Sequence, residues 1–243
     1  VPLNAETLRL DLEAIRAALN PHTRAIIFSQ PANPSGIIYD AEELQALGQL
    51  LETRSPEVMV LSDEAHRDFV PQDTELPLPA QYYANTCVLY SFGKRFLMQG
   101  QRTGYIAVSP RMPQREAFAK QLTQLCRVTG FCTPTALMQL AIRELINLEI
   151  DYSPIFARRR RLIADLRSGG YDVPDTPATF FVYPKTPMDD DFAFITRLAE
   201  AGVLAIPATV FHSTGRFRLS ATADEDQLQE AARIMNRVLS ELS

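Results

Sequence analysis

Three short polar segments of this sequence each follow a run of apolar residues, and they carry most of the side chains that could do chemistry. The segments are 30–36 (QPANPSG), 62–66 (SDEAH) and 91–94 (SFGK), and they follow the apolar runs 25–28, 58–61 and 87–90. In open α/β sheets the ligand binds beyond the carboxyl ends of the strands. If the runs are strands, these segments are where a ligand would bind.

Taken one at a time, each segment has an ordinary alternative. NPSG is typical of a turn, and Lys94 in a glycine-containing loop is typical of a surface lysine. Asp63 and Glu64 could bind a metal or form a solvated loop, but no histidine at ligand spacing supports a metal, so we predict none. A phosphate-binding P-loop is excluded, because Arg95 stands where that motif needs serine or threonine.

The apolar runs and the helical periodicities alternate through the first part of the chain, which is the pattern of an α/β fold. Asp40 is positioned to cap the second helix. Because helices separate the first two strands, much of the sheet should be parallel, and runs without alternation predict cover on both faces. The predicted helices are 5–19, 41–53, 111–128 and 134–149, and the predicted strands are 25–28, 58–61, 87–90 and 105–108.

The pattern changes after Gly169 and Gly170. Four consecutive arginines, 158–161, lie on a helix just before this point, and we interpret them as a solvated face. Beyond it we predict a smaller α+β domain, so the chain divides into domains 1–150 and 151–243. Its predicted elements are short strands near 179–183 and 216–220 and helices at 189–201 and 225–241.

Composition narrows the class of protein. The net charge of −5 argues against a nucleic-acid partner, and the absence of an apolar run near 20 residues argues against a membrane partner. Cys87, Cys126 and Cys132 are sparse and odd in number, which favours free thiols in a reducing compartment, and we expect a cytoplasmic protein. The chain begins Val-Pro-Leu-Asn, so we also expect it to be cut from something longer.

Taken together and in order, these motifs resemble the pyridoxal 5'-phosphate (PLP) enzymes of aminotransferase class I/II. The motifs are NPSG, DExH, SFGK, QRTGY at 101–105, GVLAIP at 202–207 and FRLS at 217–220. The resemblance spans nearly the whole chain and implies the aspartate-aminotransferase fold (fold type I). It implies a large domain with a mostly parallel sheet, incomplete at its N-terminus, a small C-terminal α+β domain, PLP as cofactor and a homodimer.

The resemblance also implies a role for individual residues. Lys94 stands where the family has the lysine that forms a Schiff base with PLP and then moves the proton at the substrate Cα. Asp63 matches the acid that pairs with the pyridine nitrogen, and Asn33 matches the amide that binds the phenolic oxygen. Ser91 and Arg102 match phosphate ligands.

Arg218 matches the arginine that binds the substrate α-carboxylate in a bidentate pair. Arg216 lies two residues earlier, so on a strand its side chain would point the same way. The family's pattern of arginine, aliphatic residue and serine favours Arg218, and Arg216 is left with an outer role or none.

One position departs from the family. His66 stands where tyrosine usually donates to the phenolic oxygen, and some carbon–sulfur lyases of this fold also have histidine there. An imidazole can donate to the oxygen and adds its own titration; otherwise His66 is a packed residue without cofactor contact. The favoured activity is transamination between an amino acid and a 2-oxo acid. The alternatives are β-elimination by a carbon–sulfur lyase and a non-catalytic domain that senses PLP or an amino acid.

The resemblance finally implies that a large N-terminal part of the fold is absent. In the family that part supplies a helix N-terminus for the phosphate, an aromatic residue that stacks on the pyridine ring and part of the dimer interface. We therefore expect that the 243-residue chain alone is not a competent holoenzyme.

Overall fold

The computed structural model describes residues 1–131 and 133–242 and divides into two compact units. We call them by their sheets. The four-stranded unit comprises Leu12–Pro31 and Tyr39–Ile150, and the three-stranded unit comprises Val1–Asp11, Ala32–Ile38 and Asp151–Ser243. The sequence interpretation placed all of 1–150 in one domain, whereas segments 1–11 and 32–38 group with 151–243. Cys132, one of the three predicted free thiols, lies outside the described residues; Cys87 and Cys126 form no disulfide.

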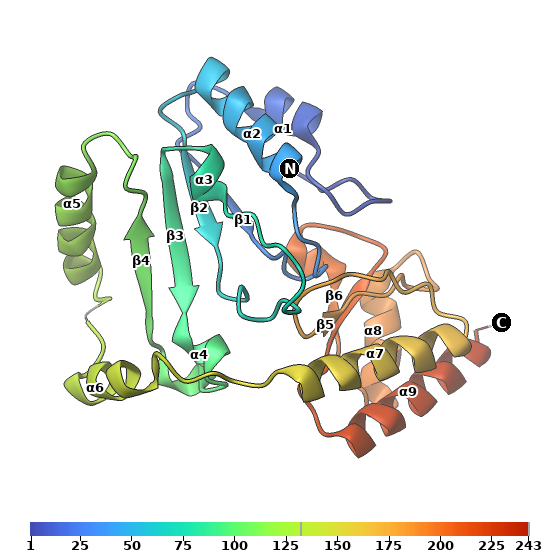
Figure 1. Cartoon of the computed structure of the whole chain (residues 1–243). Helices are drawn as coiled ribbons and strands as arrows, with labels where there is room; N and C mark the ends of the chain where they lie inside the picture. Colours follow the sequence, from blue (N-terminus) through green and yellow to red (C-terminus); the bar gives the residue numbers. More distant parts are fainter. Residues whose placement is uncertain (132, 243) are drawn as a thin grey trace. The chain divides into compact units, whose positions relative to one another are not determined.

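The sheet of the four-stranded unit has the order β1-β2-β3-β4 (Figure 1). The first three strands are parallel, as predicted, and β4 is antiparallel to β3. The carboxyl ends of β1, β2 and β3 therefore lie at the same edge of the sheet. The strands are β1 (Ala25–Ser29), β2 (Met59–Asp63), β3 (Thr86–Ser91) and β4 (Gly104–Val108).

The helices of this unit follow the predicted order. The longest one that packs into the core, α2, begins after Asp40, whose carboxylate accepts from the Glu43 amide while the Glu43 side chain returns to the Asp40 amide. Three short elements between β2 and β4 were not predicted: α3, α4 and η1. The elements are α1 (Leu12–Ala18), α2 (Ala41–Arg54), α3 (Pro79–Tyr82), α4 (Phe92–Arg95), η1 (Gln99–Gln101), α5 (Arg115–Val128) and α6 (Ala136–Leu145).

The first predicted helix is too long. Residues 5–19 were expected to be helical, but α1 begins only at Leu12. The Asn4 side chain accepts hydrogen bonds from the Glu6 and Thr7 amides, which forms a turn in place of a helical start. Leu8 then takes a left-handed backbone conformation (φ 59°) and is buried beside Tyr183. Burial of Leu8 in the three-stranded unit overrides its helical spacing.

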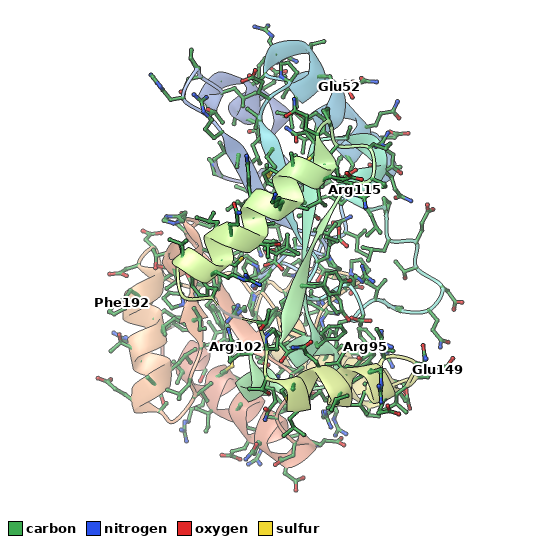
Figure 2. All side chains as sticks on the ribbon, turned by 90° about the vertical axis from the view of Figure 1, so that its left-hand side faces the viewer. Glu52, Arg95, Arg102, Arg115, Glu149 and Phe192 are labelled. Carbon is green, nitrogen blue, oxygen red and sulfur yellow. The ribbon has the colours of Figure 1, made fainter. Side chains whose placement is uncertain are left out.

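The expectation that the four-stranded sheet is covered on both faces is wrong for the described chain. Ile27 in β1 is 67% exposed, and four of the five residues of β4 are exposed. Helix α5 lies alongside β4 (Figures 1 and 2), yet no residue of α5 is buried. The apolar runs that predicted two-sided cover are therefore partly open to solvent.

The sheet of the three-stranded unit has the order β5-β7-β6, with antiparallel pairs. Its core lies between this sheet and helices α7, α8 and α9, where Leu166, Phe194, Phe217 and Met235 are fully buried. The two long helices, α7 and α9, run side by side (Figure 1). The elements are α7 (Ser153–Ser168), β5 (Phe181–Val182), α8 (Asp191–Glu200), β6 (Ile206–Pro207), η2 (Ala208–Phe211), β7 (Phe217–Ser220) and α9 (Glu225–Ser240).

The arginine run on α7 is only partly a solvated face. Arg160 and Arg161 are exposed as predicted, but Arg159 is 4% exposed. Arg159 follows Ile155 by four residues and precedes Leu162 by three, and both of these neighbours are buried. Arg159 therefore lies on the buried face of α7. The sequence interpretation missed this, because it treated all four arginines as a charged surface.

Candidate active site

Two of the expected site residues are the last residues of neighbouring parallel strands. Asp63 ends β2 and Ser91 ends β3, and in the strand register Asp63 pairs with Leu89. The two side chains therefore lie at the same edge of the sheet. The Asp63 carboxylate accepts a hydrogen bond of 3.0 Å from the Ala65 amide, and this bond orients it at the strand end.

Lys94 lies in α4, which begins directly after Ser91. The Ser91 hydroxyl makes no capping hydrogen bond to this helix. Gly93 lets the chain turn tightly here, because a Cβ at this position would lie 3.2 Å from the Gln99 Cα and 3.3 Å from the Ser91 Oγ. Ser91, the last residue of β3, and Lys94, three residues later, thereby lie within one turn of chain.

Arg102 completes this end of the sheet. It precedes β4, whose Gly104 pairs with Ser91, and Figure 2 shows Arg102 near α6, at the end of the sheet where Arg95 also lies. Arg102 and Leu97 both take left-handed backbone conformations (φ 50° and 52°). Such conformations cost about 1 kcal/mol or more in a non-glycine residue and occur preferentially at functional sites.

A hydrogen-bonded clamp that the sequence did not predict holds the Lys94 segment. The Asp68 carboxylate accepts from the Tyr90 hydroxyl (2.6 Å) and from the Arg95 guanidinium (3.0 Å). Arg95 also donates to the carbonyls of Ile146 and Leu148. Burial and the adjacent carboxylate raise the pKa of Tyr90, so it stays a donor. The sequence offered one signal for this contact. Tyr90 ends the apolar run 87–90, and a buried phenol needs a hydrogen-bond partner.

The segment after Asp63 is not the solvated loop that was the alternative interpretation. Glu64 is fully buried and His66 is 3% exposed. Glu64 accepts a 3.0 Å hydrogen bond from the Ser62 hydroxyl and forms a 3.5 Å ion pair with Arg67. Burial raises the pKa of Glu64, and these two partners oppose the rise. Whether His66 contacts a cofactor stays a prediction.

Asn33 and Arg218 meet in the three-stranded unit. The Arg218 Nη1 donates a 2.8 Å hydrogen bond to the Asn33 Oδ1. The guanidinium carbon lies 4.3 Å from the ring centroid of Phe181 and 4.8 Å from that of Phe211. Burial lowers the pKa of Arg218, which remains a cation at neutral pH. The contacts of Arg218 with these two aromatic rings were not predicted from the sequence.

The NPSG segment is a turn, and it also presents Asn33. The Ala32 amide bonds to the Ile37 carbonyl, and Gly36 has a φ of 76°. A Cβ on Gly36 would lie 2.5 Å from the Ala178 carbonyl oxygen, so only glycine fits. The turn and the functional interpretation of this motif are therefore compatible.

Arg216 has different partners from Arg218. It precedes β7, is 6% exposed and donates a 3.2 Å hydrogen bond to the Tyr183 carbonyl. Its guanidinium lies 5.8 Å from the Tyr183 ring. The two arginines thus contact different residues, although their spacing of two suggested that both side chains point to the same face of the strand.

The part of the chain that the structure describes contains no cluster of three or more His, Cys, Asp or Glu side chains that could hold a metal ion. It also contains no helix that is both long and apolar enough to cross a membrane.

Solved structures define the fold class. An aminotransferase from Eubacterium rectale superposes with a TM-score of 0.93 at 27% identity, over 99% of this chain and 62% of that one. An aspartate aminotransferase from Thermus thermophilus, solved with maleate, superposes with a TM-score of 0.85 at 27% identity, over 98% of this chain and 62% of that one. The architecture is therefore fold type I, the aspartate-aminotransferase fold, as predicted.

The chain belongs to the family described as aminotransferase class I and II, whose model matches residues 1–235. Members of this family are generally PLP-dependent. Among curated relatives, the aspartate/prephenate aminotransferase of Cereibacter sphaeroides is 30% identical over 93% of this chain and 60% of its own length. The probable aspartate/prephenate aminotransferase of Rhizobium leguminosarum is 29% identical over 94% of this chain and 61% of its own length. The chain thus spans about three fifths of these relatives.

Proposed function

We propose that this chain carries the catalytic lysine of a PLP-dependent aminotransferase that moves an amino group between an amino acid and a 2-oxo acid. The observation that carries the proposal is the convergence of Asp63, Ser91, Lys94 and Arg102 at one edge of the four-stranded sheet. Family membership supports the reaction class. We extend the proposal to a cytoplasmic homodimer, for which the exposed apolar residues of α5 and α6 offer a surface.

The chemistry of these side chains fits PLP. A bound PLP supplies a reactive carbonyl carbon and a ring that withdraws electrons. The Arg102 guanidinium and the Ser91 hydroxyl suit a phosphate dianion. The Asp63 carboxylate suits a protonated ring nitrogen, and a neutral amide there could not hold that proton. We assign to His66 and Asn33 the role of donors to the phenolic oxygen.

Lys94 has two tasks in this proposal. Its amine is the nucleophile that binds the cofactor's carbonyl carbon. With the substrate amine bound there in its place, the Lys94 amine would accept the proton from the substrate Cα and deliver it to the former carbonyl carbon of the cofactor. The short helix α4 and the Asp68 clamp support this assignment, because they hold the residues on either side of Lys94.

Arg218 binds the α-carboxylate of the substrate in this proposal. Within the described residues its one hydrogen bond is that of Nη1 to Asn33, so Nε and Nη2 remain for a carboxylate. The Phe181 and Phe211 rings stabilise the cation without using its donors. The Thermus relative was solved with maleate, a dicarboxylate, which places acidic substrates among the first to test.

The test uses a protein that contains this chain and has the relatives' full length. It is a screen of amino donors with 2-oxoglutarate and PLP, beginning with aspartate and aromatic amino acids because the relatives carry these names. Glutamate formation supports transamination. Release of pyruvate and ammonia from cysteine-like substrates, without glutamate, would favour the β-elimination that His66 motivates. PLP binding without either reaction, in a protein of the relatives' full length, would favour the sensing domain.

A further inference from the structure

Arg159 is a buried cation that the proposed chemistry leaves without a task. It lies on α7 and is 4% exposed. Its Nε donates a 2.7 Å hydrogen bond to the Phe181 carbonyl, and its Nη2 donates a 2.6 Å hydrogen bond to the Thr176 hydroxyl. Burial lowers its pKa to about 10, so it remains charged at neutral pH. Burying this charge is costly, which raises the question of what its two bonds hold.

The two acceptors of Arg159 mark the ends of one segment, 176–181. Near its start, this segment packs on the NPSG turn. A Cβ on Gly36 would lie 2.7 Å from the Thr176 Oγ1, and the Ala178 amide donates a 3.1 Å hydrogen bond to the Gly36 carbonyl. Asn33, the partner of Arg218, belongs to the same turn. Arg159 thus holds the surface on which the Asn33 turn rests.

At its other end the segment supports Arg218 itself. Phe181 gives its carbonyl to Arg159, and its ring lies 4.3 Å from the Arg218 guanidinium carbon. Between the two ends, Thr179 is fully buried in a left-handed conformation (φ 65°). A buried non-glycine residue in this conformation persists only where its surroundings hold it. The two bonds of Arg159 bracket this strained residue.

An arginine suits this task because its planar guanidinium presents donors in fixed directions. Lysine could reach one acceptor with a single ammonium group, and a neutral side chain would leave at least one buried acceptor unsatisfied, at a cost of about 1–3 kcal/mol. The position therefore depends on the shape of the guanidinium, which donates to both acceptors at once, more than on its positive charge.

We infer that Arg159 is a positioning residue for Arg218, setting its orientation toward the substrate carboxylate through Phe181 and, by way of Thr176, the Asn33 turn. The inference rests on the proposed function of Arg218. It assigns one member of the 158–161 run to the substrate site and leaves exposed Arg160 outside it.

The test follows the Arg218 guanidinium by NMR in the full 243-residue chain. Two aromatic rings flank this group, so its Nε–H signal should be displaced by their ring currents, and Arg218→Lys identifies the signal by removing it. We compare Arg159→Gln and Arg159→Lys with Arg160→Gln, the matched control on the same helix. Each variant is titrated with maleate, a small dicarboxylate, and its thermal unfolding is recorded.

We expect Arg159→Gln to move the Arg218 signal toward the position of a solvated arginine. Maleate affinity should fall about tenfold, the order of one charge-assisted hydrogen bond. Arg159→Lys should recover part of both effects, and Arg160→Gln should change neither. If Arg159→Gln does not fold, Thr176→Val tests the same path by removing one acceptor while keeping the side chain's shape.

A folded Arg159→Gln or Thr176→Val chain with an unchanged Arg218 signal and unchanged maleate affinity would overturn the inference. Failure of the proposed function looks different. In that case wild-type chain binds no maleate, while Arg159→Gln still moves the Arg218 signal, and the positioning role stands without the substrate.

Discussion

Single side chains divide the proposed chemistry between them, and their surroundings explain the division. Arg218 keeps donors for a ligand, because only its Nη1 is engaged within the described residues, by Asn33. Arg216 is also a cation, but it donates to the Tyr183 carbonyl and is 6% exposed. The contacts of Arg218 therefore support the ligand-binding role that we propose for it, whereas the contacts of Arg216, two positions earlier, are structural.

Arg218→Lys should weaken binding of an amino-acid or dicarboxylate ligand by about ten- to a hundredfold, because an ammonium group cannot reproduce the bidentate fork. PLP binding should change little. Calorimetric titration of maleate and, separately, of PLP measures the two effects. Arg216→Lys is the matched control, and a larger loss of maleate affinity in that variant would show that the wrong arginine has been chosen.

Glu64 predicts a pH-dependent stability. Its pKa is raised chiefly by burial, so the fold favours its protonated form. That contribution is fully present below the ordinary glutamate pKa of about 4.3 and is lost as pH rises through the folded value. Glu64→Gln should therefore stabilise the chain at pH 7, and the gain should shrink as pH falls toward 4.

Urea denaturation between pH 4 and 7 measures this gain, with exposed Glu57→Gln as the control for loss of a surface charge. A gain that is independent of pH, or that grows in acid, would refute the assigned shift. Such a result would mean that the Arg67 ion pair outweighs burial at this site.

At the scale of elements, the sequence predicted the framework because its signals are local. Apolar runs marked β1 to β4 within one or two residues, and Asp40 marked the start of α2. Signals that depend on tertiary contacts were missed. Leu8 has helical spacing in the sequence but packs against Tyr183 in the three-stranded unit. Arg159 is buried, and its guanidinium donates hydrogen bonds to two acceptors that are distant in the sequence.

The candidate site shows the same limit. Motif order placed Asp63, Ser91 and Lys94 at strand ends, and the parallel register brings the strand ends together. In the Asp68 clamp, Asp68 bonds to Tyr90 and Arg95, which lie 22 and 27 positions further along the chain. No rule based on sequence spacing predicts such a contact. The roles of the site residues stay predictions.

Asp68→Ala should loosen α4. It leaves the Tyr90 hydroxyl and part of the Arg95 guanidinium without a buried acceptor, which costs about 1–3 kcal/mol. Urea denaturation measures the loss, and hydrogen exchange should locate it in residues 91–98. Exposed Asp73→Ala is the control. Equal stability of the two variants would show that the clamp does not hold this segment.

At the scale of the whole molecule, the chain spans about three fifths of its relatives, and its four-stranded unit exposes apolar side chains. Ile106 is 43% exposed, Leu125 56%, Val128 84% and Leu137 76%. They lie on β4, α5 and α6. Exposed apolar patches of this kind mark association surfaces. The expectation that this chain alone is not a competent holoenzyme stays a prediction.

We predict that the 243-residue chain self-associates at micromolar concentration. Sedimentation velocity should show dimers or larger species, and Leu125→Gln with Val128→Gln should shift the distribution toward monomer. Leu204→Gln, in the three-stranded unit and 86% exposed, is the control. A monodisperse wild-type monomer would exclude this surface as an interface between copies.

We propose that Lys94 is the residue that binds PLP, and the composition of the chain makes this assignment directly testable. Lysine occurs only at positions 94, 120 and 185. Lys120 lies on exposed α5, and Lys185 pairs with Asp172 at 2.9 Å. The measurement is borohydride reduction of the chain with substoichiometric PLP, followed by peptide mapping. We predict that the pyridoxyl label is found predominantly on Lys94 and that Lys94→Ala removes it. A label on Lys120, Lys185 or the N-terminus in equal or greater yield would contradict it.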